Sequence, residues 1–247
     1  MRVHIAAACG FCYGVRRAVE LAAQAEAGTH TLGPIIHNPQ LVDSLSEKGV
    51  TPVNSLEEVA DGSRLLIRSH GVGPDVYDEA EKRRLHIVDA TCPHVKKAQQ
   101  DARKVINAKK VLVIIGEKDH PEVISISQWG GNRAIIIDKV EEAEEIPYCE
   151  TMGVVVQTTF SQSRFKQIES VLAGKTGHLD VYMTICAATR QRQEAAVELA
   201  GKVDAMIVIG GRNSANTGRL AQVCAEQGCP TYHVETAAEI NPDDFAG

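Results

Sequence analysis

The stretch HIVDATCPHVKKAQQDARKVINAKKVLVIIG, residues 86–116, contains the pattern of a strand, a helix and a second strand in close succession. Its two ends, 86–90 and 111–116, are short runs rich in β-branched residues. The stretch between them, 95–108, has the apolar spacing of an amphipathic helix. A short helix that joins two strands is typical of a parallel sheet with helices on its faces. These residues therefore predict an α/β fold.

The same alternation continues along the rest of the chain. We expect strands at 3–8, 65–69, 86–90, 111–116, 134–138, 154–158, 181–185, 205–210 and 231–235. We expect helices at 14–27, 39–48, 74–84, 95–108, 163–173, 190–202 and 217–227. No long linker rich in Gly, Pro or Ser marks a boundary, so any domains must adjoin closely. Sheets of this kind bind ligands at the carboxyl ends of their strands.

Composition excludes several classes of protein. The 247 residues are 44% hydrophobic and 23% charged, a usual globular mix, which excludes a disordered chain. No apolar run approaches the ~18 residues of a membrane span, and no signal-peptide pattern follows Met1, so we expect a cytoplasmic protein. The net charge of −6 and the 4% of aromatic residues give no support for binding nucleic acid.

Three of the seven cysteines share one local setting. Cys12, Cys92 and Cys186 each follow an expected strand and precede an expected helix. Three such thiolates could converge on an iron–sulfur cluster, one of whose irons would stay open, or on a zinc ion, and three buried thiols are the alternative. The C-x-x-C pair Cys9 and Cys12 is also typical of thioredoxin-like redox sites, although the compact thioredoxin pattern is missing. The cysteines without a partner motif are Cys149, Cys224 and Cys229.

Three histidines, His37, His70 and His120, lie where a strand or loop gives way to a helix, beside Gly or Pro. Imidazolium offers two donors near neutral pH, so this set favours a pocket for an anion, with ordinary loop positions as the alternative. Glu122 lies only two residues after His120, so we expect its carboxyl group to face the same pocket. The hydroxyl of Thr158 lies at the end of another expected strand.

A glycine-containing turn precedes the helix expected at 217–227. Gly210 and Gly211 end an apolar strand, and Ser214 and Asn216 lie at the helix start. Glycines let a backbone approach a ligand closely, and helix amides donate to anions, so this segment favours phosphate binding. Plain N-capping is the alternative, since Ser and Asn also serve as caps.

These residues belong to eight motifs that, taken in order, resemble the LytB/IspH family of 4-hydroxy-3-methylbut-2-enyl diphosphate reductases. The resemblance extends essentially from end to end of the chain. The motifs are Gly10-Phe11-Cys12 followed by Gly14-Val15, Ile36-His37-Asn38, Ser69-His70-Gly71-Val72, Asp89-Ala90-Thr91-Cys92-Pro93, His120-Pro121-Glu122-Val123, Gln157-Thr158-Thr159, Ile185-Cys186 followed by Ala188-Thr189 and Arg192-Gln193, and Gly210-Gly211 followed by Asn213-Ser214 and Asn216-Thr217.

The resemblance implies a trefoil of three similar α/β modules with mainly parallel sheets around a central [4Fe–4S] cluster. The modules would be 13–91, 92–185 and 186–247, the last completed by the N-terminal strand segment 1–12. It implies three cluster ligands, Cys12, Cys92 and Cys186. It implies a proton donor, Glu122, assisted by Thr158. It implies that the substrate is bound by His37, His70, His120, Thr158, Ser214, Ala215 and Asn216.

The implied reaction is the last step of the methylerythritol phosphate route to isoprenoids, the reductive dehydroxylation of 4-hydroxy-3-methylbut-2-enyl diphosphate to isopentenyl and dimethylallyl diphosphate. An open iron would act as a Lewis acid while Glu122 relays protons. A ferredoxin- or flavodoxin-type protein would donate electrons to a monomer or homodimer. The alternative is a non-catalytic iron–sulfur or zinc protein. A nucleotide-binding enzyme would need a G-x-G-x-x-G turn directly after the first strand. No such turn follows the strand expected at 3–8.

Two departures from the family pattern lead to a further expectation. Ala215 stands where family members often carry a second serine. The sequence ends at Phe245-Ala246-Gly247, before the family's Gly-Ala-Ser segment, which supplies another serine to the diphosphate. We therefore expect a truncated third module with an exposed sheet edge, and weaker substrate binding by roughly tenfold or more.

Overall fold

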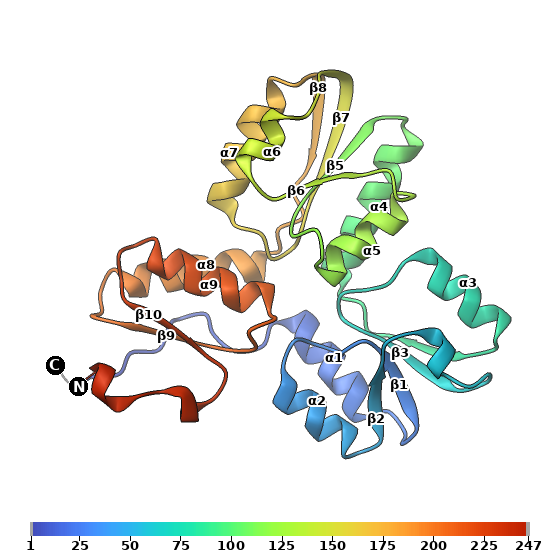
Figure 1. Cartoon of the computed structure of the whole chain (residues 1–247), viewed down its shortest axis with the longest axis horizontal. Helices are drawn as coiled ribbons and strands as arrows, with labels where there is room; N and C mark the ends of the chain where they lie inside the picture. Colours follow the sequence, from blue (N-terminus) through green and yellow to red (C-terminus); the bar gives the residue numbers. More distant parts are fainter. Residues whose placement is uncertain (1, 246–247) are drawn as a thin grey trace. The chain divides into compact units, whose positions relative to one another are not determined.

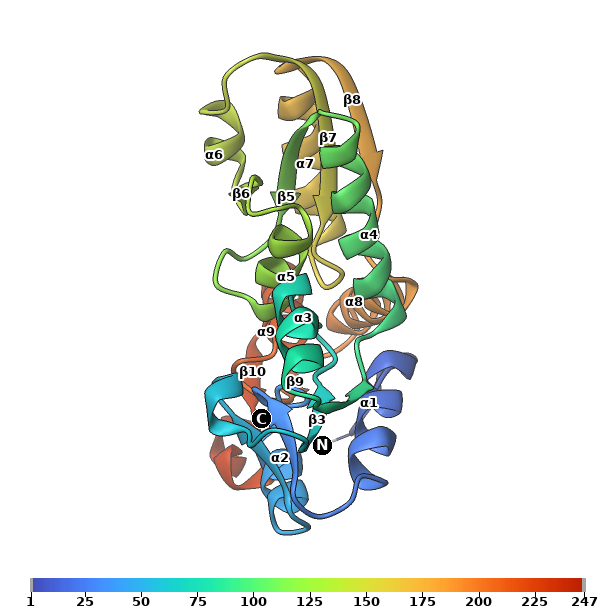
Figure 2. The same cartoon turned by 90° about the vertical axis from the view of Figure 1, so that its right-hand side faces the viewer.

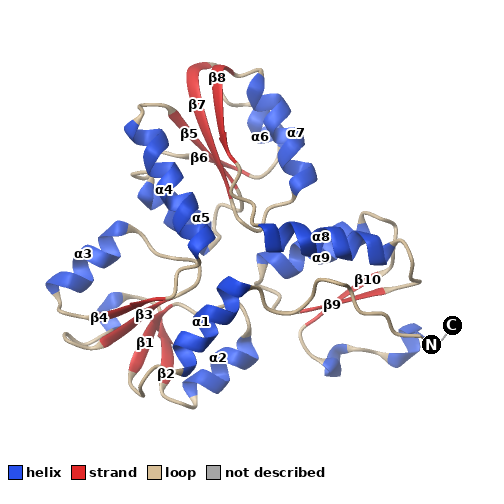
Figure 3. Cartoon of the chain, turned by 180° about the vertical axis from the view of Figure 1, so that it is seen from behind, coloured by secondary structure: helices blue, strands red, loops and turns tan. Residues whose placement is uncertain are grey.

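The computed structural model describes residues 2–245. It divides the chain into a larger unit, residues 12–36 and 40–185, and a smaller unit, residues 2–11, 37–39 and 186–245. Within the described residues every pairing between two strands is parallel. Helices cover the sheets in both units (Figure 3). The predicted α/β class with parallel sheets is confirmed.

The first sheet of the larger unit has the strand order β2-β1-β3-β4. Helices α1 and α2 pack on one face through Ala18 and Leu45, which lie in one apolar cluster with Leu66. Helix α3 covers the other face through Ala80, which clusters with Leu65. The elements are α1 (Tyr13–Ala23), β1 (Thr29–Leu32), α2 (Pro39–Ser46), β2 (Val50–Val53), the 3-10 turn η1 (Leu56–Glu58), β3 (Arg64–Ile67), α3 (Pro74–Lys82) and β4 (His86–Asp89).

The second sheet of the larger unit has the order β6-β5-β7-β8 and lies between two helical layers (Figures 1 and 2). Helices α4 and α5 share one apolar cluster with Ile114, and α6 and α7 share another with Ile115. The elements are α4 (Pro93–Asn107), β5 (Val111–Ile115), α5 (Pro121–Trp129), β6 (Ile135–Ile137), α6 (Val140–Glu144), β7 (Cys149–Val156), α7 (Gln162–Ala173) and β8 (Thr176–Tyr182).

The smaller unit has a two-stranded sheet, β10-β9. Helices α8 and α9 cover one face of it, where Ala196 and Cys224 pack against Val208. On the opposite face Ile207 and Ile209 are exposed. The elements are α8 (Ala187–Ala200), β9 (Met206–Ile209), α9 (Ala215–Ala225), β10 (Thr231–Val234) and the 3-10 turns η2 (Ala237–Glu239) and η3 (Pro242–Phe245).

The prediction of a strand at 3–8 is wrong. Residues 2–11 form neither helix nor strand, although they belong to the smaller unit. Val3 is 76% exposed and Ile5 is 80% exposed, so the apolar side of this segment is not buried as it would be in a strand of a packed sheet. The expected completion of the third module by a strand is therefore absent from the described residues. Residues 1, 246 and 247 of the expected modules lie outside them.

Membrane insertion by a helix finds no support. None of the helices within residues 2–245 combines the length and the apolar character that a membrane crossing demands.

Candidate functional site

Two of the predicted cysteine ligands lie in the larger unit, each as the N-cap of a helix. Cys12 precedes α1, and Cys92 precedes α4. Burial raises the pKa of the Cys92 thiol, and the nearby Cys12 and Glu122 add to this effect, while backbone N–H groups at His94 and Val95 oppose it by donating to the sulfur. A metal ion bound to this sulfur would favour the thiolate form.

The first turn of α1 packs directly against Cys92. A Cβ atom added to Gly14 would lie 2.5 Å from the Cys92 sulfur and 3.3 Å from its Cβ. Any side chain at position 14 would occupy this space, so glycine at this position lets the Cys92 thiol lie against the helix that Cys12 precedes. The structure thus brings together two of the three cysteines that the sequence singled out.

We expect Gly14→Ala to reduce metal binding although it favours the helix. Alanine should stabilise a helical position by up to about 1 kcal/mol, but here its methyl group displaces the Cys92 sulfur. The matched control is Gly218→Ala in α9, where an added Cβ meets nothing within 4 Å. Iron content after anaerobic reconstitution should fall in the first variant only. Equal iron content in both variants would show that the Cys92 sulfur can move without consequence.

The third cysteine, Cys186, has the same setting in the smaller unit. It is the N-cap of α8, and its sulfur accepts a hydrogen bond from the Thr189 backbone N–H at 3.3 Å. The Thr189 hydroxyl oxygen lies 3.0 Å from the same sulfur. Cys9 is exposed and caps no helix. The remaining cysteines are partly or fully buried on β7, on α9 and before β10, namely Cys149, Cys224 and Cys229.

Glu122 is a buried carboxyl group at the start of α5, with 2% of its surface exposed. The backbone N–H of Thr158 donates to one oxygen at 2.6 Å, and the Thr158 hydroxyl donates to the other at 2.8 Å. Burial raises the pKa of Glu122 to about 7, which the Thr158 donors oppose and the Glu117 carboxylate reinforces. A carboxyl group that is half protonated near neutral pH is suited to proton transfer.

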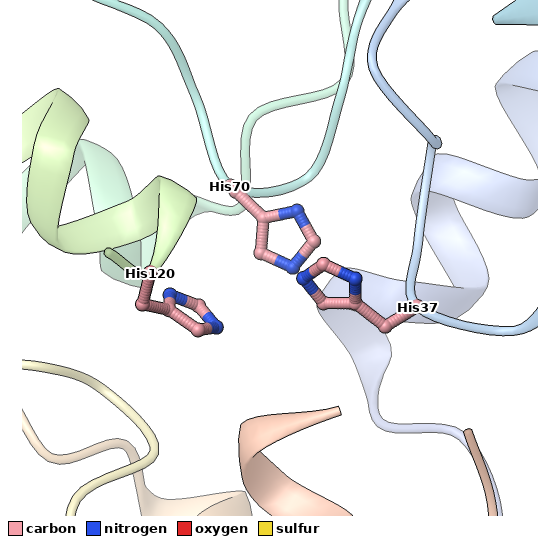
Figure 4. A group of neighbouring side chains, drawn as sticks. All are labelled: His37, His70 and His120. Carbon is pink, nitrogen blue, oxygen red and sulfur yellow. The ribbon is translucent and has the colours of Figure 1, made fainter. Parts of the chain in front are cut away.

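The histidine that caps the same helix has a defined tautomer. The Nδ1 atom of His120 accepts from the Glu122 backbone N–H at 3.1 Å, so a neutral ring carries its proton on Nε2. The His70 ring lies edge-on to the His120 ring, with centroids 5.4 Å apart and planes 82° apart. Figure 4 labels both rings, on the loop that follows β3 and at the start of α5. His37 belongs to the smaller unit.

The predicted anion-binding segment of the smaller unit is a capped helix start. The Ser214 hydroxyl is the N-cap of α9 and accepts from the Thr217 backbone N–H at 3.3 Å. Ala215 and Asn216 follow in the first turn, where backbone N–H groups have no helical partner. Side chains have no room at Gly211, because an added Cβ would clash with the carbonyl oxygen of His37.

The candidate residues therefore form two groups. The larger unit brings together Cys12, Cys92, Glu122, Thr158, His70 and His120. The smaller unit contains Cys186, Ser214, Ala215, Asn216 and His37. Sequence reasoning assigned nothing to Ser125, whose hydroxyl contacts the backbone of both Glu122 and His70. Its sequence signal is a serine placed between Ile124 and Ile126 in the apolar run of α5.

Known proteins are similar to this chain over nearly its whole length. The family described as LytB protein matches residues 3–247. Two relatives are named 4-hydroxy-3-methylbut-2-enyl diphosphate reductase. One, from Pelobacter propionicus, is 46% identical over all of this chain and 89% of its own length. The other, from Caldanaerobacter subterraneus subsp. tengcongensis, is 44% identical over all of this chain and 88% of its own.

Two solved structures are also similar. The E-1-hydroxy-2-methyl-but-2-enyl-4-diphosphate reductase from Plasmodium falciparum has a TM-score of 0.91 and 27% identity, and the match covers 96% of this chain and 77% of that one. A second structure, described as (E)-4-hydroxy-3-methyl-but-2-enyl diphosphate reductase, the terminal enzyme of the non-mevalonate pathway, has a TM-score of 0.70 and 40% identity. That match covers 99% of this chain and 89% of the other.

Proposed function

The chain belongs to the LytB family, and from this premise we propose that it is a 4-hydroxy-3-methylbut-2-enyl diphosphate reductase. It is an oxidoreductase that converts its substrate to isopentenyl and dimethylallyl diphosphate in the last step of the non-mevalonate route to isoprenoids. The observation in the site that carries this conclusion is the buried Glu122 carboxyl, with a pKa of about 7, close enough to Cys92 to affect its thiol.

The donor set fits an iron–sulfur cluster. Three cysteines, each at a helix N-cap, offer soft thiolate ligands, and backbone N–H groups reach the sulfurs of Cys92 and Cys186. We infer that the cluster is [4Fe–4S] and that Cys12, Cys92 and Cys186 are its three ligands. When bound, such a cluster supplies electrons and one iron that is open to a substrate oxygen.

The side chains of the chain supply protons and hold the diphosphate. Loss of the substrate hydroxyl as water, with a new C–H bond, takes up two electrons and two protons. Glu122 delivers a proton from its buried carboxyl, and Thr158 fixes the position of that carboxyl through two hydrogen bonds. His120 presents its Nε2–H to the anionic end of the substrate. The other diphosphate donors in the proposal are the side chains of His37, His70, Thr158, Ser214 and Asn216 and the backbone N–H of Ala215 at the start of α9.

The proposal extends to organisation and partners. The chain has three modules, 13–91, 92–185 and 186–247, whose cysteines meet at a central cluster. A ferredoxin- or flavodoxin-type protein delivers the electrons in the cytoplasm to a monomer or homodimer. The substrate is a small diphosphate, and neither nucleic acid nor membrane takes part. The arrangement is supported by the start of a helix at each of the three cysteines.

A non-catalytic iron–sulfur or zinc protein is the competing function. Such a protein needs the cysteines but has no use for a buried, half-protonated glutamate held by Thr158. Anaerobic assay with a chemical reductant and the diphosphate substrate separates the two. We expect brown protein that contains iron and sulfide and consumes the substrate. Colourless zinc protein, or brown protein without turnover, would refute the reductase.

A further inference from the structure

Ser125 connects the two sheets of the larger unit. It lies on α5, three residues after Glu122, and is 1% exposed. Its hydroxyl oxygen lies 3.0 Å from the carbonyl oxygen of His70, in the loop that follows β3, and 2.9 Å from that of Glu122. The Glu122 carbonyl also belongs to the hydrogen-bond ladder of the helix. The contact with His70 is therefore the one that joins a loop of the first sheet to a helix of the second.

Two further contacts hold the same loop. The Trp129 Nε1–H, one turn after Ser125, donates to the carbonyl oxygen of Val72 at 2.9 Å. Gly71 has a φ of +72°, and the amide nitrogen of Gln99 on α4 occupies the place where its Cβ would be. That amide also donates to the Ser125 hydroxyl at 3.2 Å. Loop residues 70–72 are thus held against α4 and α5 at three successive positions.

We propose that Ser125 is a positioning residue for His70. The helix that carries Ser125 also carries His120 at its N-cap and Glu122 in its first turn. A hydrogen bond from this helix to the His70 backbone therefore fixes one substrate-binding ring relative to the other and to the proton donor. This inference rests on the proposed function, in which both histidines hold the diphosphate.

The proposal separates binding from chemistry. Ser125→Ala removes the bond to the His70 backbone but leaves the two bonds between Thr158 and Glu122 in place. We expect KM for the diphosphate substrate to rise about tenfold, the usual effect of misplacing one donor to a charged group, while kcat stays within about threefold. Ser125→Thr keeps a hydroxyl at the same place and should recover most of the wild-type KM.

Ser127→Ala is the matched control. It also removes a serine hydroxyl group from α5. The Ser127 side chain is half-buried and forms no hydrogen bond within residues 2–245. Its KM and kcat should equal those of the wild type. Comparing Ser125→Ala with Ser127→Ala therefore controls for any general effect of replacing a serine by alanine on α5.

Trp129 gives a readout that is independent of turnover. It is the only tryptophan of the chain, and its indole N–H bonds to the loop that Ser125 holds. Fluorescence of the full chain should change in Ser125→Ala and remain as in the wild type for Ser127→Ala. Thermal unfolding of each variant shows whether a change in emission comes from the loop or from loss of the fold.

The outcomes are distinct. A raised KM and altered Trp129 emission in Ser125→Ala, with recovery in Ser125→Thr, support the proposal. Wild-type KM and emission in a folded Ser125→Ala overturn it, as does an equal change in Ser127→Ala. If the wild-type holoenzyme itself fails to consume the substrate, the proposed reductase function is refuted, and the emission comparison still decides whether Ser125 holds the loop.

Discussion

Cys92→Ser is expected to lose most of its iron and all measurable turnover. Iron–sulfur clusters are held by cysteine thiolates, and a serine hydroxyl is a weaker ligand for iron. Removing a hydrogen bond that supports a metal ligand typically lowers metal affinity or activity by roughly 10- to 100-fold, and removing the ligand itself should lower them further. Iron and sulfide are counted after anaerobic reconstitution, together with the visible absorption of the cluster.

Cys149→Ser provides the matched control for that experiment. Cys149 is also a half-buried free cysteine, but it lies on β7, where its thiol donates to the carbonyl oxygen of Thr151 at 3.7 Å and its side chain packs against an apolar cluster. Its replacement should leave iron content and turnover unchanged. If Cys92→Ser kept a full complement of iron, Cys92 would have to be removed from the ligand set and the proposed three-cysteine site with it.

Glu122→Gln should retain the cluster and lower turnover by about 10²- to 10⁴-fold. The amide has the shape of the carboxyl group and can still bond to Thr158, but it has no proton to deliver. In the wild type, kcat should fall as pH rises through about 7, because Glu122 then loses its proton. Thr158→Val removes a donor that lowers the pKa of Glu122, so its kcat should persist to higher pH. A Glu122→Gln enzyme of near wild-type turnover would assign the proton to another group.

Glu122→Gln should lower turnover but raise the stability of the folded chain above neutral pH. Burial raises the pKa of Glu122 from 4.5 to about 7, so between these values the folded chain holds a proton that the unfolded chain has released. The stabilising contribution of Glu122 is thus complete below pH 4.5 and is lost as pH rises through about 7. Glu122→Gln should therefore melt at a higher temperature than the wild type at pH 8 and at a similar temperature at pH 4.5. Equal melting temperatures at pH 8 would mean that burial does not raise this pKa.

Much of the fold follows from local patterns. The strand, the helix and the second strand predicted from residues 86–116 are β4, α4 and β5, and each expected boundary lies within two residues of the observed one. Here the β-branched runs are short, the helical spacing is regular and Pro93 lies at a helix start, so local preference and tertiary packing agree. Cys92, which lies between β4 and α4, could be singled out because the elements on both sides of it were predicted correctly.

Other elements could not be predicted, because packing overrides local preference there. Strand β2 contains Pro52, which argues against a central strand, and the structure places it at the edge of its sheet. Helix α5 contains the run Val123-Ile124-Ser125-Ile126, whose β-branched residues favour a strand. It is helical because its buried residues pack against α4 and β5. The sequence marks Ser125 only as a polar residue within an apolar run, and the role proposed for it could not be predicted because its partners lie 55 and 26 positions away.

The helix starts at the cysteines also bear on redox energetics. Backbone N–H groups donate to the sulfur of Cys92 and to that of Cys186. Such bonds favour the more negatively charged state of a cluster, and the positive end of each helix dipole acts in the same direction. The reduction potential of the bound cluster should therefore be higher than that of the same cluster on cysteines in open loops. A donor of moderate reducing power could then load it with electrons.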